Sequence, residues 1–221
     1  MKILITSGAT REPIDQVRFI TNMSTGKTGA SLAEKLARQG HKVTYLHGQG
    51  AHIPDGAAET VEYSTFSDLD QKLQSLLSKT TFDLVLHAAA VSDFSVASVR
   101  SSKSNIELDA HSKINSAEKL QVELKPNFKI LNQIKDYSQE RHPLVIGFKL
   151  TFTESEGEQQ EAIKRLFDGG SVDYVIHNDL KDMREKNRHI FRIHNESEFL
   201  SVADSVETLA NKISEIAEAR I

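Results

Sequence analysis

Short apolar runs alternate with amphipathic segments along most of this chain, and this alternation limits the fold more than any other feature. Residues 84–87, for example, form an apolar run typical of a strand that is covered on both faces. Alternating strands and helices favour a parallel sheet with helices packed on both of its faces. We therefore expect an α/β fold: a three-layer, Rossmann-like, doubly wound parallel sheet that binds ligands at the carboxyl ends of its strands.

The same pattern predicts where the elements lie. Strands are expected at residues 3–6, 43–46, 61–63, 84–87, 143–148 and 172–176, with an edge strand at 188–193. Helices are expected at 30–36, 67–77, 128–137, 158–168 and 202–216, the second of them capped by Ser67.

Residues 95–127 break the alternation, because Ser, Lys, Asn and His crowd together there without a helical stripe. Within them, residues 122–124 alternate like one strand of a hairpin. A chain of 221 residues suits one sizeable core. We expect a single domain over 1–221, with a Rossmann-like core at 1–94 and 128–221 and a mobile arm at 95–127.

Composition excludes several classes of protein. The net charge of -4 provides no basic excess for a nucleic-acid backbone, so no nucleic-acid partner is expected. The absence of Cys excludes disulfides, thiolate nucleophiles and Cys-based zinc sites. No apolar run is long enough to span a membrane, and the N-terminus has no apolar leader, so a soluble, cytoplasmic protein without membrane contact is expected.

The stretch 7–29 joins the first predicted strand to the first helix and suits an anion site. Unpaired N–H groups at the start of a helix attract anions, and the Gly and Ser/Thr residues of the stretch allow close approach. Two common motifs do not fit. Thr21 stands where a P-loop needs Gly, and the segment at 7–9 has one Gly where the dinucleotide fingerprint needs two.

Residues 15–26 (DQVRFITNMSTG) resemble the D-x-V-R-x-I-x-N-x-S-[ST]-G signature of phosphopantothenoylcysteine synthetases, the ligases that join phosphopantothenate to cysteine in coenzyme A synthesis. Residues 88–94 (AAAVSDF), 113–114 (KI) and 147–150 (GFKL) are similar to three further blocks of that family, in the same order. The resemblance covers most of the chain. It implies a stand-alone ligase domain whose arm pairs with a second subunit, forming a homodimer, and covers the nucleotide as a flap.

Joining an acid to an amine requires a donor for the oxyanion that forms on the acyl carbon. Asn22 is the candidate for this catalytic role and for substrate binding, as the resemblance also implies; the alternative is an Asn that caps a turn. Asp93 follows the predicted strand 84–87, and both nucleotide binding and a helix cap are open to it. His87 is expected to pack in the core.

The remaining site residues depend more on the resemblance. Arg18 either clamps a substrate phosphate or pairs with Asp15 on the surface. Lys113 matches the catalytic lysine of the flap, with Lys103 as the alternative. The residues expected to contact the nucleotide are Gly8, Ser24, Gly26, Ala89, Ala90, Asp93, Phe148 and Arg165, the last of which also fits a solvated helix face.

The expected co-substrate is CTP or ATP, with Mg²⁺ carried on its phosphates, because no cluster in the sequence has metal-ligand spacing. Phosphopantothenate and L-cysteine are the expected substrates. Two other functions share this type of sheet: a short-chain NAD(P) oxidoreductase and a nucleotide-binding module without turnover. Against the first, none of the four Tyr residues is followed by Lys four positions later.

Overall fold

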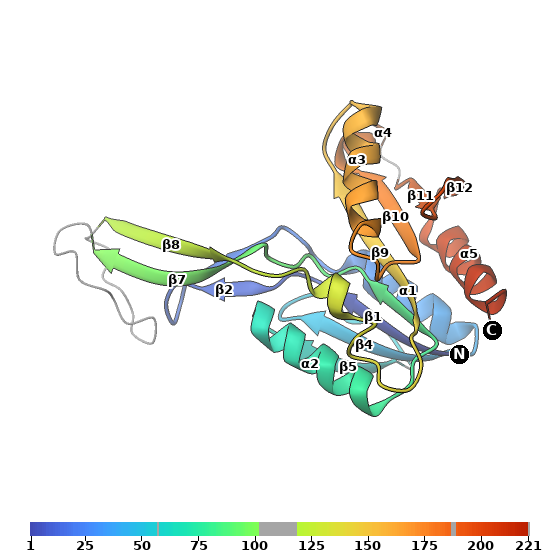
Figure 1. Ribbon diagram of the computed structural model, residues 1–221, viewed down its shortest axis with the longest axis horizontal. Coiled ribbons are helices and arrows are strands. Elements are labelled where there is room, and N and C mark those ends of the chain that lie inside the picture. The colour runs from blue at the N-terminus through green and yellow to red at the C-terminus, as the bar shows by residue number, and fades with distance from the viewer. Residues whose placement is uncertain (57, 102–118, 187–188, 221) are drawn as a thin grey trace.

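An eight-stranded sheet runs through the centre of the protein in this computed structural model, which describes residues 1–56, 58–101, 119–186 and 189–220 (Figure 1). Across the sheet the strands are β12 (Phe199–Ala203), β11 (Phe191–His194), β10 (Tyr174–Asp179), β9 (Leu144–Thr151), β6 (Leu84–His87), β1 (Lys2–Ser7), β4 (Lys42–Gly48) and β5 (Glu59–Tyr63). The strands from β10 to β5 run parallel. Strand β11 runs antiparallel to them, and β12, which is antiparallel to β11, runs in their direction again.

The strand order reverses at β1. The chain adds β4 and β5 on one side of β1, then returns to add β6, β9 and β10 on the other side. In a doubly wound sheet such a reversal leaves a crevice at the carboxyl ends of the two strands, here β1 and β6, where ligands bind. The expected doubly wound sheet is confirmed, and the antiparallel pair β11 and β12 extends it at one edge.

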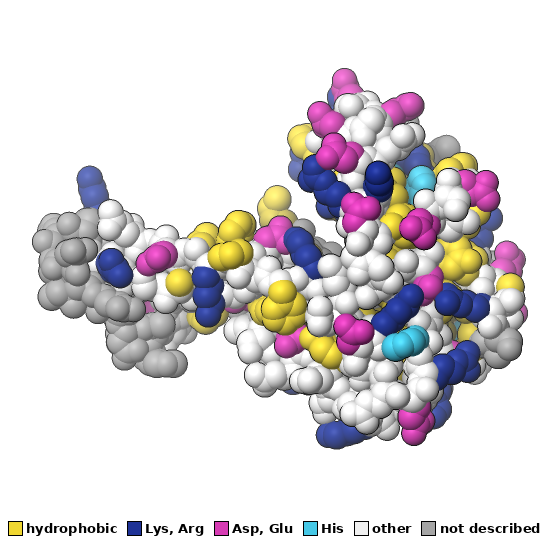
Figure 2. Space-filling view, in the orientation of Figure 1, with side chains coloured by type: hydrophobic (Ala, Val, Ile, Leu, Met, Phe, Trp, Pro, Cys, Tyr) yellow, Lys and Arg dark blue, Asp and Glu magenta, His cyan; other side chains and the backbone are white. Residues whose placement is uncertain are grey.

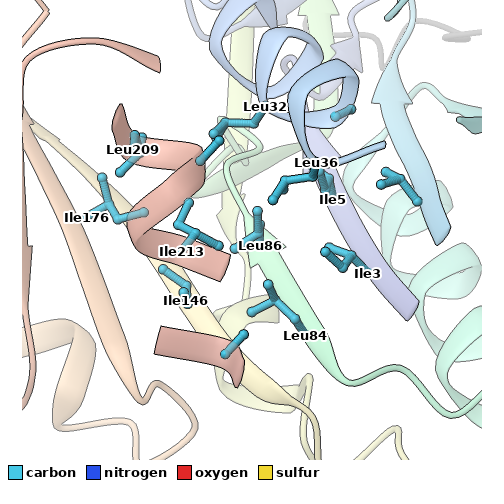
Figure 3. Close-up of a cluster of buried hydrophobic side chains, with 14 of the residues drawn as sticks. Ile3, Ile5, Leu32, Leu36, Leu84, Leu86, Ile146, Ile176, Leu209 and Ile213 are labelled. Carbon is cyan, nitrogen blue, oxygen red and sulfur yellow. The ribbon is translucent and has the colours of Figure 1, made fainter. Parts of the chain in front are cut away.

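Helices cover both faces of the sheet, as expected for three layers. Helices α1 (Lys27–Arg38) and α5 (Val206–Glu218) pack on the face formed by Ile3, Ile5 and Leu86, which Figure 3 shows between them. The opposite face is covered by α2 (Phe66–Lys79), the 3-10 helix η1 (Ile130–Gln133) and α3 (Glu156–Phe167). A short α4 (Leu180–Lys186) follows β10.

Burial on both faces explains why the central strands are apolar at every position. Successive residues of β1 point to opposite faces, so Ile3 and Ile5 belong to one core cluster and Leu4 to the other. All three are completely buried. Burying each such side chain stabilises the fold by roughly 1.5–3 kcal/mol.

Two expected helix boundaries are wrong. The helix predicted at 128–137 is instead a 3-10 turn at residues 130–133 followed by an irregular turn, and Ile130 and Ile134 both reach the core from it. The second helix begins at Phe66, and its cap is Thr65, whose side chain accepts a hydrogen bond from the amide of Asp68. Ser67 lies inside that helix.

The far edge of the sheet also differs from expectation. Strand β11 is not the edge, because β12 pairs with it from outside. Val202, which was assigned to the last helix, lies in β12, and α5 starts only at Val206. The helical spacing of apolar residues continues by coincidence through a strand of five residues.

Two hairpins extend from the sheet. Strands β2 (Arg11–Pro13) and β3 (Phe19–Thr21) pair within the long loop after β1, where the sequence indicated no regular structure. Strands β7 (Phe94–Ser101) and β8 (Leu120–Pro126) form an antiparallel arm that projects from the sheet (Figure 1). The remainder of the predicted arm, 102–118, lies outside the described residues, and the predicted division into core and arm remains a prediction.

None of the helices in the described ranges is both long enough and apolar enough to cross a membrane.

Gly29 allows α1 to pack closely on the end of β1, and this contact yields a test of the fold. A Cβ at residue 29 would lie 2.5 Å from the Cβ of Ser7, so we expect Gly29→Ala to lower the free energy of unfolding by roughly 1–3 kcal/mol. Gly157 in α3 is the matched control, because its nearest neighbour would be 3.8 Å away. Gly157→Ala should raise stability slightly, by up to about 1 kcal/mol. Urea unfolding of both variants checks this; equal effects would contradict it.

Candidate active site

The carboxyl ends of β1 and β6 are joined by backbone hydrogen bonds that continue beyond the sheet. The amide of Ala90 donates to the carbonyl of Gly8 at 2.7 Å, and the amide of Thr10 donates to the carbonyl of Ala90 at 3.4 Å. Ala9 and Ala90 form a parallel bridge. The segments that follow the two strands are therefore held together, and Gly8, Ala89 and Ala90 lie at one place, as the sequence predicted.

The N-terminus of α1 opens beside this bridge. Gly26 is the N-cap, with a positive φ of 71° that favours glycine, and its carbonyl accepts a hydrogen bond from the hydroxyl of Ser7 at 3.0 Å. A Cβ at Gly26 would lie 3.3 Å from the amide nitrogen of Gly8. The first turn of α1 carries no acidic residue, so its amide groups can attract an anion. Ser24, just before this turn, is exposed.

Asn22 reaches across to the segment after β6. Its side-chain amide donates to the carbonyl of Val91 at 3.1 Å and lies 3.4 Å from the carbonyl of Ala90. A residue that caps a turn bonds to neighbours in sequence, whereas these partners are 68 and 69 positions away. The structure therefore brings Asn22 to Ala90 and Val91, in the segment that leads to Asp93.

Asp93 lies on the surface of the same segment. The helix-cap interpretation is excluded, because Phe94 begins strand β7 instead of a helix. Its carboxylate pairs with the ammonium group of Lys129, a residue that the sequence did not single out.

Arg18 is positioned by a buried carboxylate. The side chain of Asp15 is completely buried, and its Oδ1 accepts the amides of Val17 at 2.9 Å and Arg18 at 2.8 Å. Its Oδ2 accepts hydrogen bonds from Nε and Nη2 of Arg18, at 3.0 and 2.5 Å. Asp15 and Arg18 do pair, but the pair is not a surface one. The guanidinium is held in a fixed direction, with 39% of the Arg18 side chain still exposed.

The other predicted site residues are Phe148, Arg165 and Lys113. Phe148, on β9, is half-buried against the core. Arg165 pairs with Glu161 one turn earlier on an exposed face of α3, which corresponds to the solvated face that the sequence also allowed. Lys113 and its alternative Lys103 lie outside the described residues.

Residues 1–219 match the family described as the DNA/pantothenate metabolism flavoprotein C-terminal domain. The chain belongs to this family. It is 33% identical over 180 residues to the coenzyme A biosynthesis bifunctional protein CoaBC of Thermococcus kodakarensis, covering 81% of this chain and 41% of that protein. It is 28% identical over 217 residues to CoaBC of Methanocaldococcus jannaschii, covering 98% of this chain and 48% of that protein. The chain thus spans less than half the length of these relatives.

Two solved structures have the same fold. The protein from Streptococcus pneumoniae is 26% identical, with a TM-score of 0.87 and complete coverage of both chains. A Cab2 mutant, solved in complex with phosphopantothenate-cysteine, is 20% identical with a TM-score of 0.71, covering 100% of this chain and 89% of that one. The predicted family and fold are confirmed.

Glu12, which the sequence did not single out, connects the long loop after β1 to α2 and to the arm. It is only 4% exposed, and its carboxylate accepts the amide of Phe66 at the start of α2 and the hydroxyl of Ser95 on β7, both at 2.8 Å. Ser95 also lies 3.0 Å from the side-chain oxygen of Asn127. An isolated Glu beside a Pro gives no periodic signal, so only the folded chain shows that this carboxylate is buried and paired.

Among the described residues, no group of three or more His, Asp or Glu side chains could hold a metal ion.

His87, at the end of β6, packs in the core as expected, with its Nδ1 2.9 Å from the hydroxyl of Thr6. The amide of Ala89 donates to the same hydroxyl oxygen at 3.3 Å. Burial lowers the pKa of His87 from 6.5 to about 4, because it disfavours the charged ring. The neutral ring can accept the hydroxyl proton of Thr6 at Nδ1.

The lowered pKa of His87 predicts a pH dependence of stability. Below pH 6.5 the unfolded chain takes up a proton at His87 that the folded chain refuses until about pH 4, so stability falls across this window as pH falls. The loss from His87 is up to about 3 kcal/mol. In His87→Asn the fall between pH 6.5 and 4 should be correspondingly smaller. The exposed His142 is the control, and His142→Asn should retain the slope of the parent protein in urea unfolding.

Proposed function

We propose that this chain is a phosphopantothenate-cysteine ligase. The observation that carries the proposal is the position of Asn22, whose amide lies against residues 90 and 91 at the switch point of the sheet. Membership of the family supports it, since the matched relatives are named for coenzyme A biosynthesis and the Cab2 neighbour was solved with phosphopantothenate-cysteine. These relatives are longer than this chain, so the activity is assigned to the part that the chain spans.

The reaction that suits the site has two steps. The carboxylate of phosphopantothenate attacks the α-phosphate of CTP or ATP, pyrophosphate leaves, and an acyl-nucleotide forms. The amine of cysteine then attacks the acyl carbon, and the nucleoside monophosphate leaves. Asn22 donates a side-chain N–H to the oxyanion of this second step, a role typically worth ~10²–10³ in rate.

Other residues bind the charged parts of the substrates. The open N-terminus of α1 takes a phosphate group, as helix N-termini do, and the oriented guanidinium of Arg18 binds a substrate phosphate with two N–H groups. The nucleotide lies against Gly8, Ser24, Gly26, Ala89, Ala90, Asp93 and Phe148, with Lys113 or alternatively Lys103 as its further cationic contact. Mg²⁺ arrives on the nucleotide phosphates with few protein ligands.

We extend the proposal to a homodimer formed through the arm. Phe94 and Leu124 on the arm and Phe128 at its base are 49%, 43% and 52% exposed, and Figure 2 shows hydrophobic side chains gathered along this part of the surface. Contiguous exposed apolar side chains mark interaction surfaces. A second copy of the arm would cover them, and Arg18 would then serve either its own site or that of the partner.

The ligase activity can be tested directly. Incubation with phosphopantothenate, cysteine, Mg²⁺ and either CTP or ATP should release pyrophosphate, and omission of phosphopantothenate should abolish the release. Running both nucleotides in parallel determines which one is used. Absence of pyrophosphate with both would refute the ligase, and binding of NAD(P) in its place would favour the oxidoreductase. Nucleotide binding without turnover would favour the non-catalytic module.

The role of Asn22 yields a sharper prediction. Asn22→Asp replaces the donor with a carboxylate that faces the carbonyls of residues 90 and 91, and Asn22→Ala removes the donor without adding charge. Both variants should still release pyrophosphate in the first step, but the second step should slow by ~10²–10³, so an acyl-nucleotide accumulates. Quenched reactions analysed by mass spectrometry would detect it. Unchanged turnover in the Ala variant would rule out the oxyanion role.

A further inference from the structure

Lys129 places a positive charge beside the proposed nucleotide site. It precedes the 3-10 helix η1, and its ammonium group pairs with Asp93. The side chains of Lys129 and Asp93 are 66% and 64% exposed. The pair therefore lies on the outer surface of the loop after β6, the loop against which Asn22 rests.

The backbone around Lys129 is firmly attached to that loop. The amide of Asn127 donates to the carbonyl of Asp93 at 2.9 Å, and its side-chain amide donates to the carbonyl of Ser92 at 3.1 Å. On the other side, the next residue, Ile130, is 1% exposed and belongs to the core. The Cα of Lys129 is thus fixed relative to residues 92 and 93, whereas its flexible side chain projects into solvent.

A purely structural role explains this pair poorly. Ion pairs between exposed side chains contribute little to stability, because water screens the charges and two long side chains lose freedom. The hydrogen bonds of Asn127 and the burial of Ile130 hold the segment without the charge. A charge here acts instead on molecules that approach the loop. Alone, the carboxylate of Asp93 would repel an anionic substrate, whereas a paired ammonium neutralises that carboxylate.

We propose that Lys129 is a substrate-binding residue whose ammonium neutralises Asp93 and binds a phosphate oxygen of the substrate that lies over residues 90–93. The inference rests on the proposed ligase function and adds to it a residue outside the signature blocks. Lysine suits this role because its ammonium is a compact point charge on a flexible stem with three donors. It can bind a phosphate and Asp93 together, since the two anions need different N–H groups. The phosphate belongs either to the nucleotide or to phosphopantothenate.

The test compares Lys129→Gln with Lys125→Gln, because Lys125 is also exposed and lies four positions earlier, on β8. A charge-assisted hydrogen bond contributes about 1.5–3 kcal/mol, so Lys129→Gln should raise the KM of the phosphate-bearing substrate about tenfold or more. The KM of cysteine, the kcat at saturation and the melting temperature should stay close to the parent values. Lys129→Arg should recover most of the loss. Lys125→Gln should leave every constant unchanged.

The affected constant shows which phosphate is bound. A rise in the KM of CTP or ATP alone indicates the nucleotide, and a rise in the KM of phosphopantothenate alone indicates the acid. If Lys129→Gln behaves like Lys125→Gln for both substrates, Lys129 is an ordinary surface lysine and the inference is overturned. A lower melting temperature of Lys129→Gln without a change in either KM also overturns the inference, because the pair would then be structural.

Calorimetric titration separates this inference from the ligase proposal. Each of CTP, ATP and phosphopantothenate is titrated into the parent protein and the two Gln variants without the other substrates. If the parent protein releases no pyrophosphate but Lys129→Gln weakens binding of one of these ligands, the ligase proposal fails and the role of Lys129 stands. If the parent protein binds none of the three ligands, the role of Lys129 fails too.

Discussion

The backbone bridge between the ends of β1 and β6 is the interaction on which the rest of the site depends. The amides of Ala90 and Thr10 and the carbonyls of Gly8 and Ala90 form it. It extends the parallel pairing of the two strands past their carboxyl ends. Because main-chain groups form it, its geometry does not vary with side-chain conformation. Asn22, Asp93 and the start of α1 are all positioned relative to this bridge, which gathers several polar groups at one place.

Much of the fold could be predicted from the sequence, because buried parallel strands require apolar residues at every position and the helices require an apolar stripe. The central strands and most helices follow this rule. The failures occur where an element is short. Ile130 and Ile134 have helical spacing, but a 3-10 turn brings them to the core. Val202 continues the spacing of α5 although it lies in β12. In such short segments tertiary contacts outweigh local periodicity, and no local pattern reports those contacts.

The site divides in a similar way. Asn22 and Asp93 could be proposed as site residues because each belongs to a block of residues with a recognisable pattern. Glu12 and Lys129 could not, since each acquires its meaning from a partner distant in sequence: Glu12 from Phe66 and Ser95, and Lys129 from Asp93. A lone charged residue in a loop is usually solvated, so a sequence gives no reason to select these two. Folding brings each to its partner, and that proximity is what distinguishes them from other charged residues.

The buried carboxylate of Asp15 has a consequence for binding thermodynamics. A free arginine side chain samples many rotamers, and a ligand that immobilises it must offset that loss of entropy. In this protein the loss occurs at folding, when Asp15 accepts Nε and Nη2 of Arg18. An anion that binds Arg18 as proposed would therefore meet a guanidinium that already has its orientation. Binding of an anion there would carry a smaller entropic cost, because the loop between β2 and β3 already holds the side chain in place.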